Sequence, residues 1–165
     1  MRPMLKAVLA AVILAVSFAS PVVAGPYEDG DAAYFRKDYA TALRLFRPLA
    51  DQGHAAAQFN LGVMYGNGQG VPQDYAAAVS WYRKAADQGD AAAQVNLGLM
   101  YGNGQGVPQN YVQGHMWFNL AAARFPASET ENRNKAVSAR ANVAKQMTPA
   151  QVAEAQKLAS EWKPK

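Results

Sequence analysis

The chain matches itself at an offset of 36 residues, and this internal repeat restricts its fold more than any other feature. At that offset residues 55–90 align with residues 91–126, and 21 of the 36 positions are identical. A period of about 20 to 50 residues is typical of solenoids, in which each small unit buries its apolar faces against its neighbours. The sequence therefore predicts an array of stacked, nearly identical units.

Each repeat has the pattern of two helices joined by a glycine-rich turn. A first helix is predicted over residues 55–65, where apolar side chains recur at helical spacing. A second helix begins near Asp74, and Gly89 is placed to end it. Residues 66–70, repeated at 102–106, supply the positive-φ positions that a tight turn needs. The expected fold is all-α: a short α/α solenoid of antiparallel helical hairpins with 36-residue repeats.

Gly62 and Gly98 interrupt the first helix at the same place in two repeats. A glycine inside a helix costs about 1 kcal/mol relative to alanine. Because the glycine recurs despite this cost, we expect a neighbouring helix to approach too closely there for a side chain.

The two ends of the array depart from this pattern. Residues 38–40 and 49–53 match residues 74–76 and 85–89, so residues 25–54 form a shortened first repeat in which Arg36 and Lys37 replace the glycine loop. Residues 127–165 follow the repeats 55–90 and 91–126, and a solenoid end needs a cap. We expect two capping helices there, one running from a capping box at Ser128 to about residue 146, the other opened by a box at Thr148.

The outward face of the second helix becomes apolar in the last repeat. Positions 76, 80 and 84 of the middle repeat are replaced by Val112, Met116 and Leu120. We expect the C-terminal cap of the same chain to cover this face, and the alternative is an interface with a partner or a second copy.

The repeated motifs resemble a known family. Residues 61–89 contain LG-x-MY, G-x-GV, D-Y and WY-x-KAA-x-QG, which is similar to the Sel-1-like repeat, a relative of the tetratricopeptide repeat. The resemblance covers residues 55–123, with residues 27–54 in shortened form, and residues 147–164 are similar to the ending of exported bacterial members. It implies a solenoid that binds proteins or peptides. Some members linked to β-lactam or peptidoglycan chemistry close their repeats with disulfides, and this chain has no cysteine.

The first 24 residues have the three parts of a secretory signal peptide. Arg2 and Lys6 precede an apolar stretch, and small residues follow it up to Ala24. The apolar stretch is about a dozen residues long, whereas a membrane-spanning helix needs about 20. We expect cleavage after Ala24, no stable membrane insertion afterwards, and a periplasmic or secreted protein.

Charge and motif content exclude several functions. The net charge of +4 falls to +2 once Arg2 and Lys6 leave with the signal, so nucleic acid is not an expected partner. A chain without cysteine has no thiol nucleophile and no Cys-ligated metal. The glycine loops lack the Lys-Ser/Thr of a P-loop, and His54 and His115 lie outside any metal-binding spacing. We expect no catalytic site, no metal and no cofactor.

The candidate binding residues lie on the first helices, on the side that should line the concave face of the solenoid. They are Phe59, Asn60 and Val63 in one repeat and Val95, Asn96 and Leu99 in the next. Asparagines one repeat apart can hydrogen-bond an extended peptide, while apolar neighbours form pockets for its side chains. The alternative is that both asparagines bond within their own repeats and only stabilise them. The aromatic residues Tyr65, Trp81, Tyr101 and Trp117 are expected in the core.

We therefore expect a non-enzymatic, exported adaptor that binds a protein or peptide on this concave face, as a monomer or with weak self-association. The alternative from another class is a cell-envelope hydrolase or a peptidoglycan-binding protein. β-Lactamase-like activity fits less well, because the disulfide-closed repeats associated with it are missing.

Overall fold

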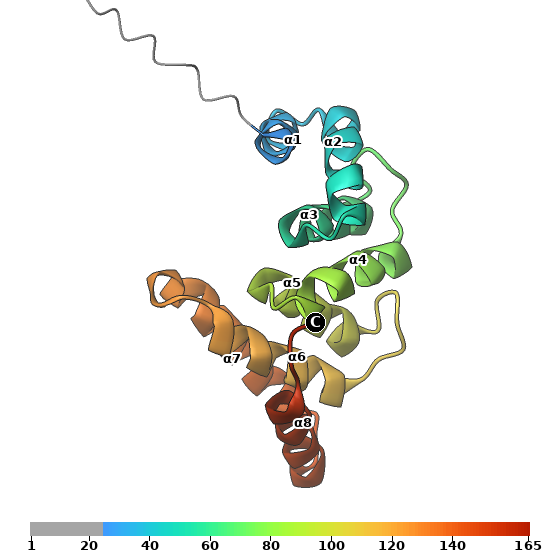
Figure 1. Ribbon diagram of the computed structural model, residues 1–165. Coiled ribbons are helices and arrows are strands. Elements are labelled where there is room, and N and C mark those ends of the chain that lie inside the picture. The colour runs from blue at the N-terminus through green and yellow to red at the C-terminus, as the bar shows by residue number, and fades with distance from the viewer. Residues whose placement is uncertain (1–24) are drawn as a thin grey trace, which may run out of the picture.

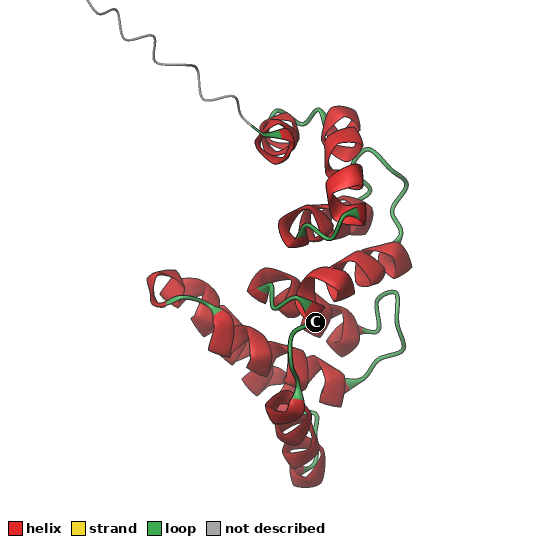
Figure 2. Ribbon diagram, viewed as in Figure 1, coloured by secondary structure: helices red, strands yellow, loops and turns green. Residues whose placement is uncertain are grey.

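A computed structural model describes residues 25–165, and every regular element in that range is a helix (Figures 1 and 2). The repeats comprise α1 (Pro26–Phe35) with α2 (Tyr39–Asp51), α3 (Ala55–Asn67) with α4 (Tyr75–Asp87), and α5 (Ala91–Asn103) with α6 (Tyr111–Arg124). A short 3-10 helix η1 (Ala127–Glu129), α7 (Thr130–Ala144) and α8 (Pro149–Glu161) follow. The predicted all-α solenoid with a helical cap is confirmed. The predicted signal peptide, residues 1–24, lies outside the described residues.

From α1 to α7 the helices stack in chain order, each against the next. In Figure 1 α1, α3 and α5 succeed one another down one side of the array, and α2 and α4 lie on the other. The last repeat helix, α6, contacts both α7 and α8. Within residues 25–165 no helix combines the length and the apolar character needed to cross a membrane.

Side-chain caps begin the five helices from α2 to α6 and recur with the period of the sequence. Asp74 accepts a hydrogen bond from the backbone N–H of Ala77 at 2.9 Å, which begins α4. His54 accepts one through Nδ1 at the start of α3, and Asp90 does the same at the start of α5. Such a cap stabilises a helix by about 1 kcal/mol. His54 and Asp90 are therefore interchangeable junction residues, as the alignment of the repeats indicates.

The repeated helix glycines mark the closest approach between the two helices of a hairpin. A Cβ atom on Gly62 would lie 2.5 Å from Cδ1 of Tyr82, and one on Gly98 would lie 2.8 Å from Cε1 of Phe118. Both distances are far shorter than a carbon–carbon contact of about 3.5 to 4.0 Å. The close approach predicted from the sequence is confirmed.

Gly30 plays the same part in the first repeat. A Cβ atom there would lie 2.7 Å from Cε1 of Phe46, so Gly30 corresponds to Gly62. The two glycines are 32 rather than 36 residues apart because the α1–α2 loop is four residues shorter than the α3–α4 loop. Lys37 takes the turn position with a φ of 63°, in the left-handed region that glycine usually occupies.

Arginines join each repeat to the next. Arg47 donates to the hydroxyl of Tyr65 at 2.6 Å, and its guanidinium lies 5.5 Å from the Trp81 ring. One repeat later, Arg83 donates to Tyr101 and lies 5.7 Å from the Trp117 ring. We call each such group an arginine staple. Trp81 and Trp117 are buried and Tyr65 and Tyr101 half-buried, so these aromatic side chains serve packing between repeats, as expected.

The C-terminal cap agrees with the sequence prediction at one helix start and not at the other. Thr148 accepts from the backbone N–H of Gln151, whose side chain accepts from the backbone N–H of Thr148, so this capping box is confirmed. The box predicted at Ser128 is wrong. Residues 127–129 form the 3-10 turn instead, which leaves Glu129 at the N-cap of α7 without a side-chain cap.

The chain's own cap covers the apolar face of the last repeat. Met116 and Leu120 are buried and Val112 is half-buried beneath the cap helices that contact α6. Beyond α8, Trp162 stacks under the guanidinium of Arg124, with 4.3 Å between the guanidinium carbon and the ring centre. Met116 and Leu120 share one buried cluster with Ala159 of α8, so the expectation that the chain's own cap covers this face is confirmed for these two residues.

Candidate peptide-binding surface

The six predicted binding residues lie on α3 and α5 in two different settings. Phe59 and Val63 are half-buried and pack against the core between the second and third repeats, with the Phe59 ring 5.9 Å from the Tyr82 ring. Val95 and Asn96 are also half-buried, whereas Leu99 is 43% exposed. Leu99 on α5 is thus the one exposed member of the six.

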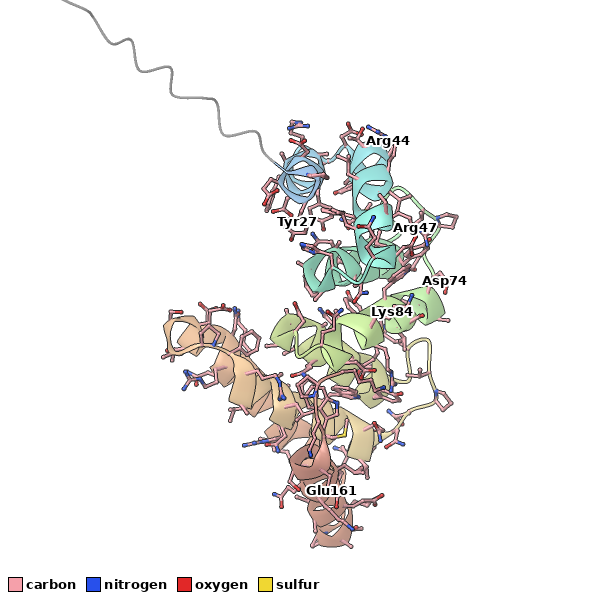
Figure 3. All side chains as sticks on the ribbon, in the orientation of Figure 1. Tyr27, Arg44, Arg47, Asp74, Lys84 and Glu161 are labelled. Carbon is pink, nitrogen blue, oxygen red and sulfur yellow. The ribbon has the colours of Figure 1, made fainter. Side chains whose placement is uncertain are left out.

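Asn60 is engaged by the preceding repeat. Its side-chain N–H group donates to the hydroxyl of Tyr27 at 3.3 Å and to Oδ1 of Asp31 at 3.5 Å, both on α1. Burial, together with the nearby Asp31 carboxylate, raises the pKa of Tyr27, so its hydroxyl stays neutral and available as a hydrogen-bond partner. Figure 3 shows Tyr27 between α1 and α3. Asn60 therefore ties two repeats together rather than bonding within its own.

Asn96, one repeat later, makes no side-chain hydrogen bond within residues 25–165. The difference follows from the neighbouring helix. Because α1 and α3 correspond at an offset of 32 residues, the places of Tyr27 and Asp31 are taken by Phe59 and Val63. Neither side chain can pair with an amide. The two asparagines occupy equivalent positions of their repeats but differ in what lies opposite them.

Three hollows border this part of the surface. The middle hollow, of about 250 Å³, lies where the α3–α4 hairpin meets α5, and its lining includes Gly66, Tyr75, Tyr82, Asn96, Leu99 and Gln105. The last hollow, of about 320 Å³, lies one repeat further and includes Leu99, Gly102, Phe118 and Val143. The side hollow, of about 200 Å³, includes Val95, Asn96, Phe125 and Lys135. Asn96 and Leu99 each border two hollows.

The chemistry of the middle hollow is polar and uncharged. None of the side chains that line it carries a formal charge. Burial raises the pKa of Tyr82 well above its ordinary value, so this hydroxyl stays protonated. Amide and hydroxyl groups in such a setting can donate and accept hydrogen bonds but are not suited to proton transfer near neutral pH.

No group of three acidic, histidine or cysteine side chains in residues 25–165 is placed to hold a metal ion. His115 is buried on α6, where burial and the charge of Arg140 on α7 lower its pKa. It does not line any of the three hollows.

Sequence reasoning missed the contributions of Tyr75, Tyr82 and Gln105 to this surface. Tyr82 lies inside the predicted second helix and Gln105 inside the predicted glycine-rich turn, and neither pattern indicates a binding role. The signal that was present is the repeat alignment itself, since Tyr82 has Phe46 and Phe118 as its counterparts and is therefore the only one of the three with a hydroxyl group.

The repeats match a described family along most of the chain. The Sel1 repeat matches residues 23–54, 55–90 and 91–124. The chain belongs to the Sel1 repeat family. Sel1 repeats generally mediate protein–protein interactions, and the helical hairpins and inter-repeat contacts described above agree with this assignment.

Two solved structures share the fold. One is the crystal structure of c5321, described as a protective antigen present in uropathogenic Escherichia coli strains and displaying an SLR fold. Its sequence is 36% identical and its TM-score is 0.73, and the match covers 84% of this chain and 30% of that one. The other is a Sel1 repeat protein from Oxalobacter formigenes, 28% identical with a TM-score of 0.60, over 82% of this chain and 61% of that one. The chain therefore spans less than two thirds of either structure. Comparison with curated proteins finds no match.

Proposed function

We propose that this Sel1 repeat protein is an exported, non-enzymatic adaptor that binds a protein or peptide across α5, with Val95, Asn96 and Leu99 in contact with the partner. The observation that carries the proposal is the contrast between the two asparagines. Asn60 is used to join repeats, whereas Asn96 offers a half-buried amide with no partner in residues 25–165.

An unpaired amide on a half-buried surface suits a ligand that brings its own hydrogen-bonding groups. A partly desolvated polar group without a partner costs free energy, and a peptide backbone can supply both the donor and the acceptor that an amide needs. Asn96 lies between the middle and side hollows, and Leu99 lies between the middle and last hollows. An extended peptide bound across them can place side chains in separate hollows while Asn96 holds its backbone.

Export is supported by the composition of residues 1–24, which have the charged, apolar and small-residue regions of a signal peptide. The proposed location is the periplasm or the medium. Expression from the natural start with a C-terminal tag tests this part, because the exported protein should have a mass that begins at Gly25. Recovery of an unprocessed chain from the cell interior would refute export without affecting the binding proposal.

The binding proposal is tested by crosslinking cells that express the tagged protein at native level and identifying what copurifies. Asn96→Ala should reduce partner recovery while leaving the thermal midpoint nearly unchanged, because the Asn96 amide makes no hydrogen bond within residues 25–165 that the substitution could remove. Asn60→Ala is the matched control, and loss of its hydrogen bonds to Tyr27 and Asp31 should lower the free energy of unfolding by about 0.5 to 1.5 kcal/mol.

Undiminished recovery of the partner by Asn96→Ala would show that the binding surface lies elsewhere. Recovery of glycan fragments in place of a protein or peptide would contradict the adaptor and favour the peptidoglycan-binding alternative.

A further inference from the structure

The interface between the first and second repeats contains a tyrosine that fills the space corresponding to the middle hollow. Tyr34 on α1 donates its hydroxyl hydrogen to Oε1 of Gln69 at 3.1 Å. The side-chain N–H group of Gln69 in turn donates to the hydroxyl of Tyr39 at 3.2 Å. The rings of Tyr34 and Tyr39 meet edge to face, with their centres 5.5 Å apart. This interface satisfies its own polar groups.

The next interface has the same surroundings without the tyrosine. Gln105 and Tyr75 are the counterparts of Gln69 and Tyr39, and both line the middle hollow. The loop glycines fix this correspondence, because Gly70 lies against the backbone of Tyr39 as Gly106 lies against that of Tyr75.

The place of Tyr34 is taken by Gly66. The offset of 32 residues between α1 and α3, set by Gly30 and Gly62 against their aromatic partners, makes these two positions equivalent. A Cβ atom on Gly66 would meet nothing closer than Cβ of Ala78 at 3.6 Å and the hydroxyl of Tyr82 at 3.9 Å. The position thus has room for a Cβ atom, and it borders the middle hollow.

Several polar side chains around Gly66 have no strong hydrogen-bond partner within residues 25–165. Tyr82 is only 5% exposed, and its hydroxyl makes no hydrogen bond within residues 25–165. Asn96 is likewise unpaired there, and the only side-chain bond to Gln105 is a long one of 3.4 Å from its neighbour Asn103. The Tyr82 hydroxyl opens onto the hollow, and a bound group can donate a hydrogen bond to it or accept one from it.

We propose that the middle hollow is a socket for a tyrosine side chain of the partner peptide, held as Tyr34 is held in the first interface. The inference rests on the proposed peptide-binding function and specifies the residue that is recognised. The ring lies edge-on to Tyr75, and the phenol hydroxyl donates to Gln105 while accepting from Tyr82.

The properties of the hollow select this side chain. A volume of about 250 Å³ falls below the range of about 300 to 1,000 Å³ for small-molecule sites and suits a single side chain. A carboxylate or ammonium group would lose its hydration without gaining an opposite charge, since no charged side chain lines the hollow. Phenylalanine would fit but would leave Tyr82 and Gln105 unpaired.

The last hollow provides an internal comparison. It lies one repeat away, but Phe118 stands where the middle hollow has Tyr82, and Asn142, Val143 and Gln146 of α7 line its far side. It offers no counterpart of the buried hydroxyl. The preference for a phenol is therefore specific to the middle hollow.

The test uses ¹⁵N-labelled protein exported from its own signal and titrated with two capped tripeptides, acetyl-Ala-Tyr-Ala-amide and acetyl-Ala-Phe-Ala-amide. The tyrosine peptide should shift the side-chain amide resonances of Gln105 and Asn96 and bind about tenfold more tightly than the phenylalanine peptide, the factor expected for one buried polar pairing. Equal affinities, or shifts confined to the side hollow, would overturn the socket.

Two variants separate the socket from other binding modes. Gly66→Tyr supplies the side chain that Tyr34 supplies in the first interface and should abolish binding of the tyrosine peptide, while the matched control Gly66→Ala should bind it normally. Tyr82→Phe, which restores the residue found at positions 46 and 118, should reduce the preference for tyrosine over phenylalanine to about one. Unchanged binding in Gly66→Tyr, or an unchanged preference in Tyr82→Phe, would overturn the proposal.

The same variants distinguish this inference from the function on which it rests. If Asn96→Ala loses the cellular partner and Gly66→Tyr retains it, the adaptor stands and the tyrosine socket fails. If no protein or peptide partner is recovered with the unaltered protein, the adaptor itself fails. Failure of the hollow to bind either tripeptide at millimolar concentration also refutes the socket.

Discussion

Adding one methyl group at Gly62 should destabilise the protein, although the same change favours a helix. The new Cβ atom would lie 2.5 Å from Cδ1 and 2.6 Å from Cε1 of Tyr82, so the ring must move by about 1 Å to reach an ordinary contact. The ring is 95% buried and cannot swing into solvent. Overpacking of this kind costs about 1 to 3 kcal/mol, and the helical preference of alanine returns about 1 kcal/mol. We expect Gly62→Ala to be less stable than the unaltered protein by up to about 2 kcal/mol.

Gly66→Ala is the control one turn along the same helix. Its Cβ atom would make only ordinary contacts, the nearest at 3.6 Å, so this variant should gain about 1 kcal/mol from helical preference. Urea unfolding followed by circular dichroism measures the free energy of unfolding of both variants. An unchanged slope of this free energy against urea concentration would show that the variants unfold in the same transition. The difference between the two variants isolates the steric cost, at about 1 to 3 kcal/mol. If their stabilities agree within about 0.5 kcal/mol, the argument from close approach is refuted.

Two further predictions concern the C-terminal half. Thr148→Ala should lower the free energy of unfolding by about 1 kcal/mol because it removes a helix cap, whereas Ser128→Ala, outside any cap, should change it by less than about 0.5 kcal/mol; urea titration of both decides this. Burial and Arg140 hold the pKa of His115 below its ordinary value of about 6.5, so the unfolded chain takes up this proton first. The contribution of His115 to the free energy of unfolding should therefore be complete above about pH 6.5 and decrease as the pH falls from about 6.5 toward the lowered pKa. His115→Gln should remove this decrease when urea unfolding is measured as a function of pH.

The architecture could be predicted because the repeat encodes it twice. Several features required for packing appear at both members of a pair 36 residues apart, so a costly residue such as Gly62 is recognised when Gly98 repeats it. The same redundancy identified the aromatic residues of the arginine staples, although not the arginines themselves. Arginine is typical of exposed positions, so the sequence around Arg83 gives no sign of its role. That role depends on the rings of Tyr101 and Trp117 in the following repeat.

The candidate site could be predicted only in part, because the residues that face the two asparagines do not correspond at the 36-residue offset of the repeat. Asn60 and Asn96 are equivalent at 36 residues, but their surroundings are set by α1 and α3, which correspond at 32. An alignment at 36 residues pairs the two asparagines correctly, but it places Tyr27 opposite Val63 instead of opposite Phe59, its counterpart in the structure. The different pairing of the two amides therefore depends on the packing of Gly30 against Phe46, which sets the offset of 32 residues between α1 and α3.

The capping box predicted at Ser128 failed for a local reason. Its four residues satisfy the sequence pattern, but the chain is already coiling there, and the hydroxyl of Thr130 donates to the backbone carbonyl of Ala127. A 3-10 turn that leads directly into a helix leaves no extended residue to serve as the cap. Thr148 has an extended backbone, and its box forms.

The arginine staples also determine how many units the array can hold. Each pairs one repeat with the next, so a further copy of residues 55–90 inserted after residue 90 would bring an arginine for its successor together with a tyrosine and a tryptophan for its predecessor. Lengthening in the middle requires no adjustment of either neighbour. A repeat added after the third one would find no arginine to pair with, because Asn119 occupies the arginine position. Asn119 itself accepts a hydrogen bond from Arg140 of α7 in the cap. The arginine staples are thus modular along the interior of the array and end at Asn119, where the C-terminal cap begins.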